Sequence, residues 1–188
     1  MEIYRTFLGI PLKVGAGFLE GRDWLIHHLK DERISWVDPG LYHVTIRFLG
    51  DTPVSLAGEI SHLMGQMQCI PAVTRIGITG PGSFGWARWP KVVWTGFRQE
   101  DFFISLHRSM NALLEEAGIQ SPDQPFRPHL TLGRIRSLRD PERFHRELEL
   151  VKDHFKGEVK ADRLVYYRSI HGKDGPRYEP LHTIEFRN

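Results

Sequence analysis

The chain alternates between stretches with strand character and stretches with helical periodicity. Strands are predicted where β-branched and aromatic residues run between turn signals. These stretches are residues 3–12, 34–37, 42–49, 70–79, 92–97, 128–135, 159–169 and 178–186. Asp38-Pro39-Gly40 is a strong turn signal between the second and third of them. Long strands of this kind, separated by amphipathic helices, indicate an α+β fold.

Helical spacing of apolar residues predicts four helices. They cover residues 17–30, a segment that starts at Asp51-Thr52-Pro53, residues 101–117, and a segment that starts at Asp140-Pro141. The second and third repeat the offsets i, i+4, i+7, i+8 and i+11, which place the apolar residues on one helix face. Gly118 supplies a stop for the helix over 101–117.

Two of the predicted strands carry the same short motif, one in each half of the chain. The first is His43-Val44-Thr45-Ile46 and the second is His129-Leu130-Thr131-Leu132. With 10 histidines in 188 residues, roughly 0.07 matches to this loose pattern are expected by chance. The repetition therefore favours function over two unrelated structural histidines.

The strand period of two fixes the geometry of each motif. The histidine and the threonine project from one face of the strand, and the two aliphatic residues project from the other. If the two strands face each other across a cleft, the cleft contains two imidazoles and two hydroxyls. One neutral imidazole can take a proton from water while a protonated one gives a proton to a leaving oxygen. The set suits hydrolysis of a phosphodiester without a metal or a covalent intermediate.

Nearly the whole chain resembles the two-histidine (2H) phosphoesterases, specifically the bacterial and archaeal RNA 2',3'-cyclic phosphodiesterases once called 2'-5' RNA ligases. The resemblance covers residues 5–10, 43–50, 90–94 and 126–134. It implies two pseudo-symmetric α+β lobes, each an antiparallel sheet with outer helices, around a central cleft. Residues 1–188 would form a single bilobal domain.

The resemblance also implies the reaction and the roles of the site residues. A terminal 2',3'-cyclic phosphate of RNA would be opened to a 2'-phosphate, with His43 as proton donor and His129 as proton acceptor. Thr45, Thr131 and Arg134 would bind the phosphate, and no cofactor or metal is expected. The expected partners are RNA ends with a cyclic phosphate, tRNA fragments among the candidates, or small nucleotides.

Simple alternation leaves several neighbouring residues ambiguous. Arg134 falls on the face opposite His129, so it reaches the cleft only if the strand twists, bulges or ends there. Phe48 has the same parity and is predicted to be core. The tryptophan-rich segment 83–90 either stacks on RNA bases or packs a loop. Residues 80–85 match G-x-G-x-x-G, but no helix can follow at Trp86, so a glycine-rich loop is predicted instead of a dinucleotide site.

Composition indicates where the protein works in the cell more clearly than which reaction it performs. Basic and acidic residues nearly balance, 25 against 23, so a nucleic-acid substrate has to be held by a local patch. The single cysteine, Cys69, placed by its neighbours at the end of a buried helix, cannot form an internal disulfide. No signal peptide and no apolar run of about 18 residues is found. A cytoplasmic monomer, not associated with a membrane, is therefore expected.

Three alternatives remain open from the sequence. The substrate could be another cyclic or 2'-5' nucleotide, such as ADP-ribose cyclic phosphate or 2'-5' oligoadenylate. The same cleft could serve a non-catalytic RNA-binding module, although binding alone needs no acid–base pair. The reverse reaction, 2'-5' RNA ligation, is the third, and the excess of water favours hydrolysis over it.

Overall fold

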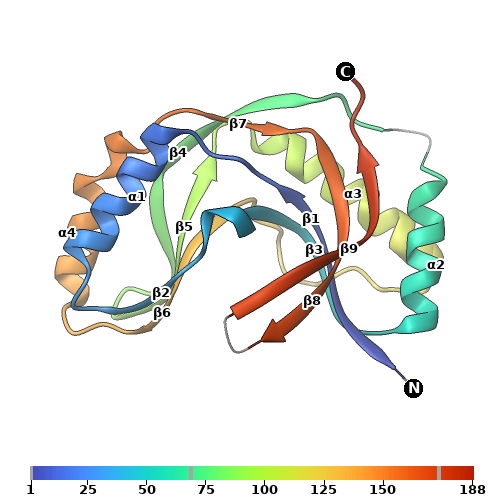
Figure 1. Cartoon of the computed structure of the whole chain (residues 1–188), viewed down its shortest axis with the longest axis horizontal. Helices are drawn as coiled ribbons and strands as arrows, with labels where there is room; N and C mark the ends of the chain where they lie inside the picture. The colour runs from blue at the N-terminus through green and yellow to red at the C-terminus, as the bar shows by residue number, and fades with distance from the viewer. Residues whose placement is uncertain (1, 68–69, 173–174) are drawn as a thin grey trace.

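The computed structural model describes residues 2–67, 70–172 and 175–188 and has an α+β architecture (Figure 1). One antiparallel sheet has the strand order β3-β1-β8-β9 and a second has the order β2-β6-β5-β4-β7. The four strands of the first sheet are β3 (His43–Pro53), β1 (Ile3–Pro11), β8 (Arg163–Gly172) and β9 (Gly175–Glu185). The five of the second are β2 (Arg33–Trp36), β6 (Leu130–Ser137), β5 (Trp89–Phe97), β4 (Thr74–Trp86) and β7 (Glu158–Ala161). The predicted fold class is confirmed.

Four α-helices in the described ranges cover the two sheets. They are α1 (Ala16–His28), α2 (Val54–Gly65), α3 (Glu100–Glu116) and α4 (Pro141–Leu150). Helices α2 and α3 pack on the four-stranded sheet, and α1 and α4 lie together at the opposite end of the molecule (Figure 1). None of the helices in the described part of the chain is long and apolar enough to cross a bilayer.

The two motifs bury their aliphatic residues as the strand period predicts. The side chains of Val44, Ile46, Leu130 and Leu132 are at most 1% exposed and belong to the same hydrophobic cluster. That cluster holds residues from both sheets and all four helices. Burial of these four side chains fixes which face of β3 and of β6 turns away from the core.

Predicted helix boundaries agree closely with the structure, with one shift. Asp140 caps α4 by accepting a hydrogen bond from the backbone N–H of Arg143, and Gly118 follows α3 with φ of 75°. The helix expected to start at Asp51 begins only at Val54, because β3 continues to Pro53 beside β1. The prediction for Cys69, the end of a buried helix, lies outside the described residues.

One loop prediction and one strand prediction were wrong. Residues 80–85 are not a loop but belong to the second half of β4, which forms a hairpin with β5. Glycine is needed there because a Cβ on Gly82 would stand 2.8 Å from the Trp94 ring, and Gly85 has φ of 114°. The single strand predicted over 159–169 is two strands in different sheets, β7 and β8, which separate at Asp162.

Candidate active site

Both motifs line one cavity of about 450 Å³ between the two sheets. His43 and Thr45 come from β3, Thr131 comes from β6, and His129 directly precedes β6. Arg134, further along β6, lines the same cavity. The fold thus brings together the five residues singled out from the sequence. The two histidines among them are 86 residues apart in the chain.

The two imidazoles are held in the same way. His43 Nδ1 lies 2.8 Å from the carbonyl oxygen of Leu41, and His129 Nδ1 lies 2.8 Å from the carbonyl oxygen of Arg127. A carbonyl oxygen can only accept, so each Nδ1 carries the proton. In the neutral form, the Nε2 atom of each ring is therefore the free basic nitrogen.

A β-bulge explains how Arg134 reaches the cavity. Val93 of β5 pairs with Gly133, and the next residue, Trp94, pairs with Thr131, so Leu132 is an extra residue in β6. An extra residue reverses the alternation of side chains beyond it. Leu132 and Gly133 are both buried, and Arg134 then falls on the same face as His129.

The first motif has a bulge at the equivalent position. Leu8 of β1 pairs with Arg47, and Gly9 pairs with Thr45, so Ile46 is the extra residue in β3. Phe48 is consequently 51% exposed, and the prediction that it belongs to the core was wrong. Phe48 stands five residues after His43, as Arg134 stands five after His129. The two bulges thus expose an aromatic ring in one motif and a cation in the other.

The surroundings of both histidines lower their pKa values below the usual 6.5. Burial is the main cause for His43 and for His129. The hydrogen bond to the backbone carbonyl raises each pKa in part, and the positive charge of Arg134 lowers both. Charge on His129 lowers the pKa of His43 further. At neutral pH, these shifts favour the neutral form of each ring.

Aromatic side chains pack against both histidine rings, and no pattern in the sequence predicts these contacts, although Phe84 lies in the aromatic segment 83–90. Phe7 lies 4.9 Å from His43 between ring centroids, and Tyr178 of β9 lies 5.2 Å from it edge-on. Phe84 of β4 meets His129 edge-on at 4.8 Å. These residues come from strands remote from the motifs, so only the pairing of strands reveals them.

A second cavity of about 520 Å³ adjoins the first and shares Thr45 and His129 with it. Its walls include three phenylalanines, Phe48, Phe84 and Phe126. Aromatic walls of this kind can stack on a nucleobase. Across the described ranges, no group of three or more His, Cys, Asp or Glu side chains is arranged to hold a metal ion.

Two strands, each presenting an imidazole and a hydroxyl to one cavity between two sheets, define a two-histidine phosphoesterase. The model of the 2'-5' RNA ligase superfamily matches residues 26–173, so the chain belongs to this superfamily.

Named relatives and a solved structure agree with this assignment. The RNA 2',3'-cyclic phosphodiesterase of Methanothermobacter thermautotrophicus is 25% identical over 180 residues, which cover 96% of this chain and 97% of the relative. The enzyme of the same name from Thermotoga maritima is 29% identical over 153 residues, which cover 81% and 79%. The fold is similar to that of E. coli LigT in its crystal structure with 3'-AMP, with a TM-score of 0.70 at 23% identity over 100% of both chains.

Proposed function

We propose that the protein hydrolyses the 2',3'-cyclic phosphate at the end of an RNA to a 2'-phosphomonoester. The observation that carries the proposal is the convergence of both His-x-Thr motifs on one cavity, each histidine held through Nδ1 by a backbone carbonyl. Relatives that cover nearly the whole chain bear the name of this activity. A cyclic-phosphate RNA end, tRNA fragments included, is the proposed partner of a monomeric, cytoplasmic enzyme.

The two Nε2 atoms divide the proton transfers. Neutral His129 removes a proton from water as the water oxygen bonds to phosphorus. Protonated His43 gives its Nε2 proton to the ribose 3'-oxygen as the bond between phosphorus and that oxygen breaks. The phosphate remains on the 2'-oxygen, and the proton lost by water balances the proton gained by the 3'-hydroxyl. No metal takes part in this scheme.

The remaining polar side chains of the cavity bind the phosphate. The hydroxyls of Thr45 and Thr131 donate hydrogen bonds to the non-bridging oxygens, one from each sheet. Arg134 neutralises the charge that these oxygens carry, which grows in the transition state. An anion in the cavity also offsets the desolvation that lowers the histidine pKa values, so binding of substrate favours protonation of His43.

The direct test uses an RNA that ends in a 2',3'-cyclic phosphate, incubated with and without EDTA. We expect turnover to a 2'-phosphate that EDTA does not reduce. His43→Ala and His129→Ala should each lower kcat by roughly 10²–10⁴-fold, the range for acid–base groups. His62→Ala is the matched control, because His62 is an exposed histidine of α2 that lines none of these cavities.

Each part of the proposal has an outcome that contradicts it. A 3'-phosphate product would reverse the assignment of the leaving oxygen. Loss of turnover with EDTA, restored by a divalent ion, would overturn the metal-free scheme. Full activity in either alanine variant would remove that histidine from the reaction. Turnover of ADP-ribose cyclic phosphate or 2'-5' oligoadenylate in place of the RNA would assign the same chemistry to another substrate. Accumulation of joined strands from cyclic and 5'-hydroxyl ends would show that ligation competes.

A further inference from the structure

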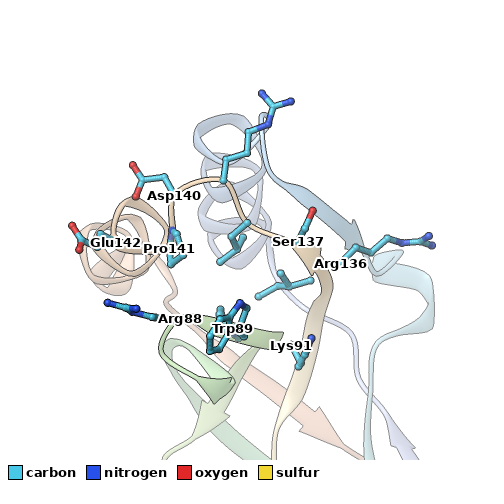
Figure 2. Close-up of a pocket in the computed structure, with 12 residues that line it drawn as sticks. Arg88, Trp89, Lys91, Arg136, Ser137, Asp140, Pro141 and Glu142 are labelled. Carbon is cyan, nitrogen blue, oxygen red and sulfur yellow. The ribbon is translucent and has the colours of Figure 1, made fainter.

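A pocket of about 590 Å³ lies beside the candidate active site and has no role in the reaction proposed above. It is bounded by the turn between β4 and β5, by the end of β6, and by the start of α4 (Figure 2). Resting on the proposed function, we infer that this pocket binds the single-stranded RNA that precedes the cyclic phosphate, with Trp89 stacking on a base and Lys91 and Arg136 contacting the backbone.

The pocket adjoins the candidate active site at one residue of β6. Arg136 lines both cavities, and it follows Arg134 on the same face of β6. Arg136 lies five residues after Thr131, with one bulge between them, so at about 3.3 Å per residue it lies roughly 13–17 Å along the strand. A cyclic phosphate is the 3' end of its RNA. When it lies in the cavity, the preceding nucleotides must therefore extend out of the cavity along the protein surface. The cationic face of β6 leads to this pocket.

The charges are distributed to suit a phosphate backbone on the side of the active site. Figure 2 shows Arg136 and Lys91 at one end of the pocket, and Asp140 and Glu142 together with Arg88 at the other. Neither Lys91 nor Arg136 belongs to an ion pair found among the described residues. The carboxylate of Asp140 is occupied as the cap of α4. Arg136 donates a hydrogen bond from Nε to the Ser35 hydroxyl at 3.0 Å, which leaves its two terminal nitrogens for a phosphate. Lys91 and Arg136 can thus contact phosphates, in a chain whose overall charge is only +2.

The aromatic part of the pocket suits a base. Trp89 is 67% exposed and lies on the hairpin side of the pocket, across from Pro141 (Figure 2). Ile135 and Leu138 add apolar surface to the same pocket. A base stacked on tryptophan would cover surface that otherwise faces water. The alternative prediction for segment 83–90 was that its aromatic residues pack a loop. That alternative does not explain why the Trp89 side chain is so exposed.

The hairpin that carries Trp89 is fixed in place. His145 of α4 donates a hydrogen bond from Nε2 to the carbonyl oxygen of Ala87, at 2.8 Å. Trp89 pairs with Trp86 across the hairpin, and Trp86 is 81% exposed but does not line the pocket. This hydrogen bond fixes the hairpin to α4 beside the pocket, and Trp86 supplies a control in the same hairpin but outside the pocket.

The test compares two substrates, a nucleoside 2',3'-cyclic monophosphate and a single-stranded oligoribonucleotide with the same cyclic end. Trp89→Ala should raise KM for the oligonucleotide roughly 5- to 100-fold, as stacking on an aromatic side chain predicts. Lys91→Ala should lower the slope of log KM against log salt by about 0.7, the value for one phosphate contact on a single strand. Both variants should leave kcat/KM for the monophosphate unchanged. Trp86→Ala and Arg75→Ala, an exposed cation of β4 outside the pocket, should behave as wild type.

The outcomes separate this inference from the proposed function. Equal KM for the two substrates in wild type, or an equal effect of Trp86→Ala and Trp89→Ala, would overturn the pocket assignment while hydrolysis stands. If wild type opens neither substrate, the proposed function fails. Binding of an oligoribonucleotide, measured by fluorescence anisotropy, then decides the inference separately. It is supported if Trp89→Ala and Lys91→Ala weaken this binding, and it is overturned if they do not.

Discussion

At the scale of single residues, the chemistry of the site follows from what surrounds each imidazole. Burial disfavours the charged form of His43 and His129, and the charge of Arg134 adds to that effect. The carbonyl oxygens of Leu41 and Arg127 oppose it by accepting from Nδ1. Each ring is thus a weaker base than free histidine, with its lone pair directed from a fixed position.

These pKa shifts predict an acidic optimum for kcat/KM. As pH falls, His129 is protonated and the base is lost; as pH rises, His43 is deprotonated and the acid is lost. Both pKa values lie below 6.5 in the free enzyme, so we expect a bell-shaped profile of kcat/KM centred on the acidic side of neutrality. The two limbs report the coupled pair and not one ring each.

Arg134→Gln should move the whole profile toward higher pH. Removal of the guanidinium charge makes protonation of both rings easier, so both limbs should shift upward while the maximum falls through loss of a phosphate contact. Arg136→Gln is the matched change, because Arg136 lines the same cavity but does not lower either histidine pKa. A profile that stays in place in Arg134→Gln would mean that this charge does not reach the imidazoles.

At the scale of elements, two bulges decide which side chains enter the site. The period of two correctly predicts the faces of His43, Thr45, His129 and Thr131 from the sequence. It fails for Arg134, because an extra residue in β6 is set by pairing with β5 and leaves no local sign in the sequence. The equivalent extra residue in β3 has the same effect on Phe48.

Helices were predicted more accurately than strand partners, for a physical reason. The face of α3 and the cap of α4 depend on residues within a few positions of one another. Membership of a sheet depends on segments far away, so the separation of β7 from β8 at Asp162 had no local signal. The glycine-rich part of β4 was misread as a loop because the groups that its glycines approach, such as the Trp94 ring beside Gly82, lie on other elements.

Gly82→Ala tests whether that glycine is required for packing. Its Cβ would stand 2.8 Å from Cζ2 of Trp94, whose ring stacks on Phe84 at 4.8 Å. Because the stacked ring has little room to move, we expect the free energy of unfolding to fall by about 1–3 kcal/mol, as for overpacked cores. Urea denaturation measures the change.

Gly58→Ala is the same substitution at another position, and we expect it to change the free energy of unfolding in the opposite direction. A Cβ at Gly58, in the interior of α2, would meet nothing within 4 Å. Alanine should therefore raise the free energy of unfolding by about 0.5–1 kcal/mol through the lower entropy cost of forming the helix. If Gly82→Ala stabilises the protein as Gly58→Ala does, the close approach of Trp94 does not constrain β4.

At the scale of the whole molecule, the halves of the sequence are exchanged between the lobes. Strand β2 and helix α1 come from the N-terminal half but lie with the five-stranded sheet and its helix α4. Strands β8 and β9 come from the C-terminal end but complete the sheet that holds β1 and β3. Neither lobe can be completed by a continuous half of the chain. We therefore propose that residues 1–188 fold as a single bilobal domain.

Cooperative unfolding is the consequence that tests this proposal, and the tryptophans make the test specific. All five tryptophans lie in α1 or in the five-stranded sheet, namely Trp24, Trp36, Trp86, Trp89 and Trp94. Leu8 lies in β1, in the other sheet, and is fully buried. Leu8→Ala should remove about 2–5 kcal/mol of stability.

In one domain, Leu8→Ala must lower the urea midpoint of tryptophan fluorescence as much as that of far-UV circular dichroism. Ile3→Ala is the control, since Ile3 is in the same strand but 54% exposed, and it should shift neither midpoint appreciably. If the two lobes unfold separately, Leu8→Ala would leave the urea midpoint of tryptophan fluorescence unchanged. The circular dichroism signal would then show two transitions. His43 and His129 lie with different sheets, so unfolding of either lobe alone would separate the two histidines and abolish activity. In one domain, activity should therefore be lost along the same urea curve as the tryptophan signal.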